Sequence, residues 1–271
     1  MKQISILGCG WLGLPLAKKL IEKGNSVNGS TTSENKLSVL KDSRINPFLI
    51  TVESDSVSEN INAFLAESEI LIIDIPPKLR TVDPNSDQKV FVKKIQNLIP
   101  FIEKSSVKKV LFVSSTSVYG DDNTVITEKT SPNPETESGK QLFMAENHLR
   151  ENQNFETTIL RFGGLIGEDR HPVKHLTGKE NIENPDAPVN LIHQNDCILI
   201  IEEIINQSIW NEVFNAVAPF HPTREEYYTQ KAIEKNLPKP KFSSEKSNIK
   251  KIISSEKIES ILNYKFGLED Y

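Results

Sequence analysis

The chain has 271 residues, a formal net charge of −5, and basic residues scattered among acidic ones. This length allows one large or two modest domains, and the scattered charge argues against nucleic acid or an anionic membrane as the main partner. Cys9 and Cys197 are far apart in sequence, which argues against a disulfide framework. The apolar run before Cys9 is too short for a signal peptide, and no segment approaches the ~20 apolar residues of a membrane span. We therefore expect a soluble cytoplasmic protein.

Short apolar runs alternate with longer helical patterns through the first 163 residues. Strands are predicted at 3–8, 25–30, 47–52, 69–75, 109–115 and 157–163. Helices are predicted near 11–23, 34–42, 58–67, 86–104 and 134–151. Several of the strands are apolar on both faces, which is typical of a parallel sheet covered by helices on each side. The pattern predicts an α/β fold with a doubly wound parallel sheet of the Rossmann type.

After residue 163 a long polar stretch interrupts this alternation. The elements predicted beyond it are a strand at 189–192, a helix at 195–207, a strand at 212–218, a helix opened by the capping-box pattern Thr223-x-x-Glu226, and a last helix near 255–263. We assign residues 1–163 to an NAD(P)-binding Rossmann domain. We assign residues 164–271 to a smaller α/β substrate-binding lobe that partly rejoins the main sheet.

The segment Gly8-Cys9-Gly10-Trp11-Leu12-Gly13 has the GxGxxG pattern, between a predicted strand and a predicted helix. In such a unit the first glycine makes a tight turn, and the second lets a pyrophosphate approach the backbone. The third lets the helix pack on the strand, and the helix N-terminus faces the phosphates. The pattern therefore predicts a dinucleotide cofactor, and a structural turn without a ligand is the alternative.

The end of the second strand bears on which dinucleotide is bound. NAD sites usually place an acid about 20 residues after the glycines, where it would repel a 2′-phosphate. Here no acid precedes Glu34, and the hydroxyls of Ser30, Thr31 and Thr32 and the ammonium of Lys36 would accept a phosphate. The sequence therefore favours NADP over NAD. Thr31-x-x-Glu34 is also a capping-box pattern for the next helix, and both interpretations can hold.

Four hydroxyl residues, Ser114 to Ser117, lie at the carboxyl end of the predicted fifth strand, the sheet edge where open α/β sheets bind ligands. With the glycine pattern, Lys140 in its helix, RFGGLIG at 161–167 and NLIHQND at 190–196, the chain resembles the short-chain dehydrogenase/reductase superfamily. It is most similar to the extended, epimerase/dehydratase-like branch, in an atypical subgroup often labelled as sugar epimerases. The resemblance covers roughly the first 200 residues. Typical extended members space their glycines GxxGxxG, and this chain departs from them there.

The resemblance implies three catalytic groups. A tyrosine four residues before a lysine is the general acid/base, the lysine lowers the pKa of that phenol and binds the nicotinamide ribose, and a serine or threonine holds the reacting oxygen. Ser115 and Lys140 match two of these positions, but Thr136 stands where the tyrosine would be. An alkyl alcohol is far less acidic than a phenol, whose pKa is about 10. Tyr119 and His193 are candidates to replace it, although the resemblance implies packing and loop roles for them.

Basic residues in and after the sixth strand are candidate substrate ligands. Arg161, Arg170 and His171 would bind a phosphate of a sugar nucleotide there, and a solvated loop with scattered charge fits the sequence equally well. His171 and His175 are spaced i, i+4, but no carboxylate or cysteine pattern accompanies them, so no metal site is predicted.

The leading hypothesis is an NADP-binding oxidoreductase or epimerase that acts on a sugar or nucleotide-sugar by hydride transfer. Thr136 motivates a second, a non-catalytic NADP-binding sensor or regulator. The N-terminal GCGWLGLPLAKKL motivates a third, a β-hydroxyacid dehydrogenase-like reductase with an all-helical second domain. The assigned residues are Ser115, Lys140, Thr136 and Tyr119 for catalysis, Gly8, Gly10, Trp11, Leu12, Gly13, Ser30, Thr31, Thr32, Lys36, Pro76 and Lys140 for the cofactor, and Arg161, Arg170 and His171 for the substrate. The oligomeric state is left open.

Overall fold

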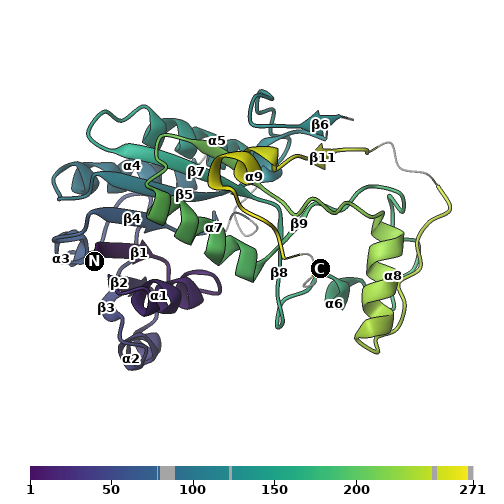
Figure 1. Ribbon diagram of the computed structural model, residues 1–271, viewed down its shortest axis with the longest axis horizontal. Helices are drawn as coiled ribbons and strands as arrows, with labels where there is room; N and C mark the ends of the chain where they lie inside the picture. The colour runs from purple at the N-terminus through teal and green to yellow at the C-terminus, as the bar shows by residue number, and fades with distance from the viewer. Residues whose placement is uncertain (78, 80–88, 122–123, 246–248, 268–270) are drawn as a thin grey trace.

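The computed structural model describes residues 1–77, 79, 89–121, 124–245, 249–267 and 271. Its central sheet has seven strands in the order β10-β7-β5-β4-β1-β2-β3 (Figure 1), and every pairing in it is parallel. The strands are β1 (Gln3–Leu7), β2 (Ser26–Thr31), β3 (Asn46–Leu49), β4 (Ile70–Ile73), β5 (Lys109–Ser115), β7 (Glu156–Phe162) and β10 (Val213–Ala216). The predicted doubly wound sheet is confirmed.

Helices cover both faces of this sheet. One face carries α1 (Gly13–Glu22), α2 (Leu37–Asp42), α7 (Gln194–Gln207) and α9 (Glu256–Leu262). The other carries α3 (Ile61–Leu65), α4 (Val90–Glu103) and α5 (Glu137–Arg150). In β4, Ile70 and Ile72 enter the first core cluster, whereas Leu71 and Ile73 enter the second. The apolar run of β4 is therefore explained by burial on both sides.

Part of the chain after residue 163 forms a smaller body beside the sheet, visible at α6 (Val173–Leu176) and α8 (Arg224–Glu234) in Figure 1. It contains the parallel pair β8 (Gly164–Ile166) and β9 (Leu191–His193). A further short pair joins β6 (Val125–Ile126) to β11 (Ile252–Ile253). These strands do not fit an all-helical second domain. Because β10 completes the main sheet and α7 packs on it, the predicted boundary at residue 163 stays a prediction.

The predicted helix near 86–104 corresponds to α4, and its residues 86–88 lie outside the described part of the chain. Among the described residues, no helix has both the length and the apolar character that a bilayer crossing needs.

Candidate cofactor and substrate site

The glycine turn, residues 8–13, is closely packed at its two ends and open in the middle. Gly8 has a φ of 109°, and a Cβ built on it would lie 2.3 Å from the carbonyl oxygen of Asp74. A Cβ on Gly13 would lie 2.2 Å from the carbonyl oxygen of Gly8, whereas one on Gly10 would meet nothing within 4 Å. The backbone N–H of Gly8 donates to Oγ of Ser30 at 2.9 Å. This geometry fits a dinucleotide, because the backbone is open at the glycine that the pyrophosphate approaches.

The loop after β8 lies against the glycine turn. The indole Nε1 of Trp11 donates to Oδ1 of Asp169 at 2.8 Å, and the guanidinium carbon of Arg170 lies 4.9 Å from the Trp11 ring centre. A Cβ built on Gly167 would come within 2.9 Å of the same ring. Leu12 is buried directly before α1. Arg170, predicted as a substrate residue, therefore lies beside Trp11 of the predicted cofactor set.

The residues predicted to favour NADP divide into two groups. The Ser30 hydroxyl is buried and holds Gly8, and Oγ1 of Thr31 accepts the backbone N–H of Ser33 at 3.1 Å. Thr32 and Lys36 are exposed. The 3-10 helix η1 (Glu34–Lys36) has no side-chain cap, so the capping box suggested by the sequence is not formed. Thr32 and Lys36 are thus the members of the predicted set whose side chains face solvent.

Asp74, which the sequence analysis missed, follows β4 directly. Its carboxylate is partly buried beside Gly13, and burial raises the pKa of Asp74 to about 7 although the backbone N–H of Gly13 lowers it. Pro76 is exposed two residues further along. The available signal was the single acid at the end of the apolar run Ile70–Ile73. A carboxylate at the carboxyl end of a central strand lies where ligands of this fold bind.

The serine turn, residues 114–119, contacts the start of α5. Oγ of Ser115 accepts the N–H of Ser117 at 3.1 Å, and a Cβ on Gly139 would lie 2.2 Å from the Ser117 carbonyl oxygen. Thr136 is the N-cap of α5, and its Oγ1 accepts the N–H of Gly139 at 3.1 Å. Lys140 is exposed, and its ammonium contacts no acid or acceptor in the described part of the chain. Ser115 and Lys140 thus lie on contacting segments, and Thr136 caps the helix instead of lying on its face.

Tyr119 and Arg161 belong to a buried polar network. The guanidinium of Arg161 forms an ion pair with Glu146 of α5 at 2.5 Å and donates to the phenol of Tyr119 at 2.6 Å. The phenol donates to Asn215 of β10 at 3.0 Å, and Ser114 donates to Glu146 at 2.6 Å. Burial raises the pKa of Tyr119, so the phenol is neutral at physiological pH. A catalytic role for Tyr119 and a substrate contact for Arg161 stay predictions.

The imidazoles of His171 and His193, near the predicted pocket, accept backbone N–H groups of the turns that follow them. Nδ1 of His171 accepts the N–H of Val173 at 3.2 Å, so Nε2 carries the proton and donates to the Tyr227 hydroxyl at 3.0 Å. Burial lowers the pKa of His171 to about 4. His193 is the N-cap of α7, and its Nδ1 accepts the N–H of Asn195 at 3.2 Å. Both imidazoles are buried, and the predicted substrate role of His171 stays untested.

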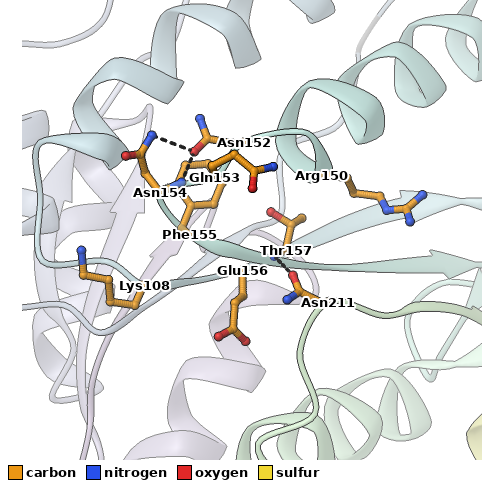
Figure 2. Close-up of a pocket in the computed structure, with 9 residues that line it drawn as sticks. All are labelled: Lys108, Arg150, Asn152, Gln153, Asn154, Phe155, Glu156, Thr157 and Asn211. Atoms are coloured by element: carbon orange, nitrogen blue, oxygen red, sulfur yellow. Dashed lines mark hydrogen bonds between the residues drawn. The ribbon is translucent and has the colours of Figure 1, made fainter.

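A separate hollow of about 630 Å³ lies at the opposite edge of the sheet, where β5 and β7 begin (Figure 2). It is lined by Lys108, Arg150, Asn152, Gln153, Asn154, Phe155, Glu156, Thr157 and Asn211. Since ligands of open α/β sheets bind at the carboxyl ends of the strands, we do not assign this hollow to the site. In the described ranges, no three His, Cys, Asp or Glu side chains gather where they could share a metal ion.

A seven-stranded parallel sheet with a glycine turn before α1 defines a dinucleotide-binding α/β protein. A family model described as NAD(P)H-binding matches residues 8–190, and the chain belongs to this family.

Relatives and solved structures agree with this assignment. The chain is 32% identical to Protein YeeZ of Escherichia coli (strain K12) over 273 residues, covering 100% of this chain and 97% of the relative. The UDP-glucose 4-epimerase of Thermotoga maritima, solved with UDP-glucose, shares the fold with a TM-score of 0.81 and 19% identity, covering 99% and 95% of the two chains. A UDP-glucuronic acid 4-epimerase of Bacillus cereus, solved with UDP-glucuronic acid and NAD, has a TM-score of 0.78 and 18% identity, covering 99% and 97%. The predicted NAD(P)-binding family is confirmed by the family model, and the solved structures show that the epimerases share this fold.

Proposed function

We propose that the protein is an NADP-dependent oxidoreductase or epimerase that acts on a sugar or nucleotide-sugar by hydride transfer. The observation that carries the proposal is the contact between the serine turn and the start of α5. It puts Ser115 and the solvent-facing Lys140 on adjoining segments at the carboxyl ends of the strands. The UDP-sugars and NAD named for solved structures of the same fold support this substrate class.

The chain's own groups have separate tasks in this scheme. Bound nicotinamide supplies the hydride acceptor or donor. Oγ of Ser115 accepts a backbone N–H, so its hydrogen is free for a substrate oxygen. The Lys140 ammonium would donate hydrogen bonds to the hydroxyls of the nicotinamide ribose. Thr136 cannot act as a phenolate base, and a positioned general base typically contributes about 10²–10⁴ in rate.

Preference for NADP over NAD rests on Thr32 and Lys36, which are exposed just after β2. Replacing Lys36→Met should weaken NADPH binding about tenfold and leave NADH binding unchanged, because an ammonium contact to the 2′-phosphate is charge-assisted. Lys41→Met, an exposed lysine in α2, is the matched control. Equal losses for both cofactors in Lys36→Met would contradict the preference.

The remaining assignments belong to the same proposal. We assign the cofactor to residues 1–163 and the substrate to 164–271, with Arg170 as the exposed cation of the substrate set. A cytoplasmic location is supported by Cys9 and Cys197, which are buried and unpaired.

A specific observation also favours the second hypothesis, a non-catalytic NADP-binding sensor. Thr136 has no phenol and serves as a helix cap, and the phenol of Tyr119 is buried, so neither residue can replace the family's accessible tyrosine beside Lys140. Under this hypothesis NADPH raises the melting temperature, yet no substrate is converted.

One experiment separates the two hypotheses. The purified protein is incubated with NADP or NAD and a panel of nucleotide-sugars, and absorbance at about 340 nm and epimer products are followed. Turnover that is lost in Lys140→Met and kept in Lys129→Met, an exposed lysine outside the site, supports the enzyme. Absence of turnover across the panel, together with a thermal shift by NADPH, supports the sensor.

A further inference from the structure

Asp74 contacts both ends of the glycine turn. Its carbonyl oxygen lies 2.3 Å from the position of a Cβ on Gly8, and its Oδ2 lies 3.3 Å from that of a Cβ on Gly13. The carboxylate therefore lies beside Gly13, the first residue of α1, whose backbone N–H favours its charged form. Both glycines lack a Cβ, and this lets Asp74 lie so close to the turn.

The N–H groups at the start of α1 are the ones that a GxGxxG turn directs toward the cofactor. A pyrophosphate bound there would lie close to the Asp74 carboxylate, and both are anions. We propose that Asp74 opposes the cofactor's pyrophosphate at the start of α1, so that the cofactor binds more tightly when this carboxyl is protonated. The proposal rests on cofactor binding alone and not on the hydride-transfer chemistry.

Compared with the titratable and charged groups around it, Asp74 is the one that titrates near neutral pH. They are Cys9 of the glycine turn, Cys197 of α7 and Arg170 after β8. Burial raises the pKa of Cys9 to about 12 and raises the pKa of Cys197 well above its usual range, so both thiols are neutral. Arg170 is cationic throughout, and its charge favours the ionised form of Asp74.

The direction of the effect follows from linkage. Burial raises the pKa of Asp74 to about 7, so the carboxyl is neutral below that pH and charged above it. A bound pyrophosphate raises the pKa further, because it disfavours the charged form, and binding therefore takes up a proton. Above the pKa of the free protein, affinity should fall by up to about tenfold for each pH unit.

The test uses NADH as the probe, because the 2′-phosphate of NADPH would titrate with a pKa of about 6. Dissociation constants are measured by fluorescence for wild type, Asp74→Asn and Asp55→Asn. Asp74→Asn removes the charge and keeps the size and an amide oxygen of the side chain, and Asp55 is an exposed acid away from the glycine turn. Circular dichroism and urea unfolding confirm that each variant is folded.

Between about pH 6 and about pH 8.5, the wild-type and Asp55→Asn dissociation constants should rise by about tenfold or more. Asp74→Asn should bind NADH more tightly than wild type at the higher pH and show no such rise. Calorimetry in buffers of different ionisation enthalpy should detect proton uptake on binding in wild type and none in Asp74→Asn.

Equal pH slopes in wild type and Asp74→Asn, or weaker binding by the variant at high pH, would overturn the proposal. Absence of NADH and NADPH binding in all three proteins at every pH would overturn the cofactor assignment and this proposal with it. A protein that binds NADH as expected but converts no nucleotide-sugar would leave the proposal standing and count against the proposed enzyme.

Discussion

The serine turn with α5 and the glycine turn with the end of β4 both hold a carboxylate, and they hold it in opposite ways. Glu146 is 1% exposed and meets two side chains, the guanidinium of Arg161 and the hydroxyl of Ser114. Asp74 lies beside the backbone of Gly13, and Arg170 acts on it through its charge. The first region is a closed network that joins strands and a helix, whereas the second is open beside Gly10.

The two carboxylates at this edge of the sheet therefore have different roles: Glu146 stabilises the fold, whereas Asp74 influences ligand binding. A fully paired buried carboxylate holds elements together, and removing its partner leaves a charge that the interior cannot solvate. A partly buried carboxylate next to open backbone remains responsive to pH and to a bound anion. Changes in the closed region should therefore cost stability, and changes in the open region should alter ligand affinity.

The largest effect is expected from Arg161→Leu, which leaves Glu146 buried without its partner. Loss of one member of a buried ion pair typically costs about 3–5 kcal/mol. The free energy of unfolding is measured by urea denaturation, and the double variant Glu146→Leu with Arg161→Leu is the control. The double variant should lose clearly less. A single variant that loses under about 1 kcal/mol would break the comparison, since the network would then not be closed.

Gly139→Ala should come next. The added Cβ would lie 2.2 Å from the backbone oxygen of Ser117, so the start of α5 must move away from the serine turn. Overpacking of this kind typically costs about 1–3 kcal/mol. Thermal unfolding measures the cost. An unchanged melting temperature would show that this contact can relax freely.

Tyr119→Phe should have a smaller effect on stability. The change removes the hydroxyl that accepts from Arg161 and donates to Asn215, and it keeps the buried ring. A hydrogen bond to a charged group contributes about 1.5–3 kcal/mol to stability, and a neutral one about 1 kcal/mol. Because the Arg161–Glu146 ion pair remains, we expect the free energy of unfolding to fall by only about 1 kcal/mol. Urea denaturation measures the loss, and a gain in stability would argue against the network as described.

Gly10→Ala should change stability least, by under about 1 kcal/mol, because a Cβ there meets nothing within 4 Å and no left-handed backbone is required. The methyl group would nevertheless obstruct the approach of a pyrophosphate, so NADH affinity should fall at least about tenfold. Fluorescence titration and thermal unfolding of the same sample test both statements. Unchanged NADH affinity would move the cofactor away from this turn.

The parts of the fold carried by periodic patterns were predicted well. Each predicted strand before residue 163 corresponds to a strand of the main sheet, and the capping box at Thr223 and Glu226 is formed. Strands of two or three residues, such as β6, β8, β9 and β11, carry almost no periodic signal, and of these only β9 overlaps a predicted strand, the one at 189–192.

The site was harder to predict, because its contacts join residues far apart in the chain. Nothing local indicates that the Ser30 hydroxyl is used by Gly8, or that Asp74 meets Gly13. The role of Thr136 follows from where α5 begins, and helix boundaries are among the least certain features of a sequence-based prediction. Spacing alone placed Thr136 on a helix face, one turn before Lys140.

The outer position of β10 has a consequence for how the protein is made. Its Val213 pairs with Ile159 of β7, so the edge of β7 stays unpaired on the ribosome until the chain has been extended beyond residue 216. An apolar strand with a free edge is a template for pairing with another chain. Until β10 has left the ribosome and paired with β7, a sheet already formed by the earlier strands would offer this edge to another chain.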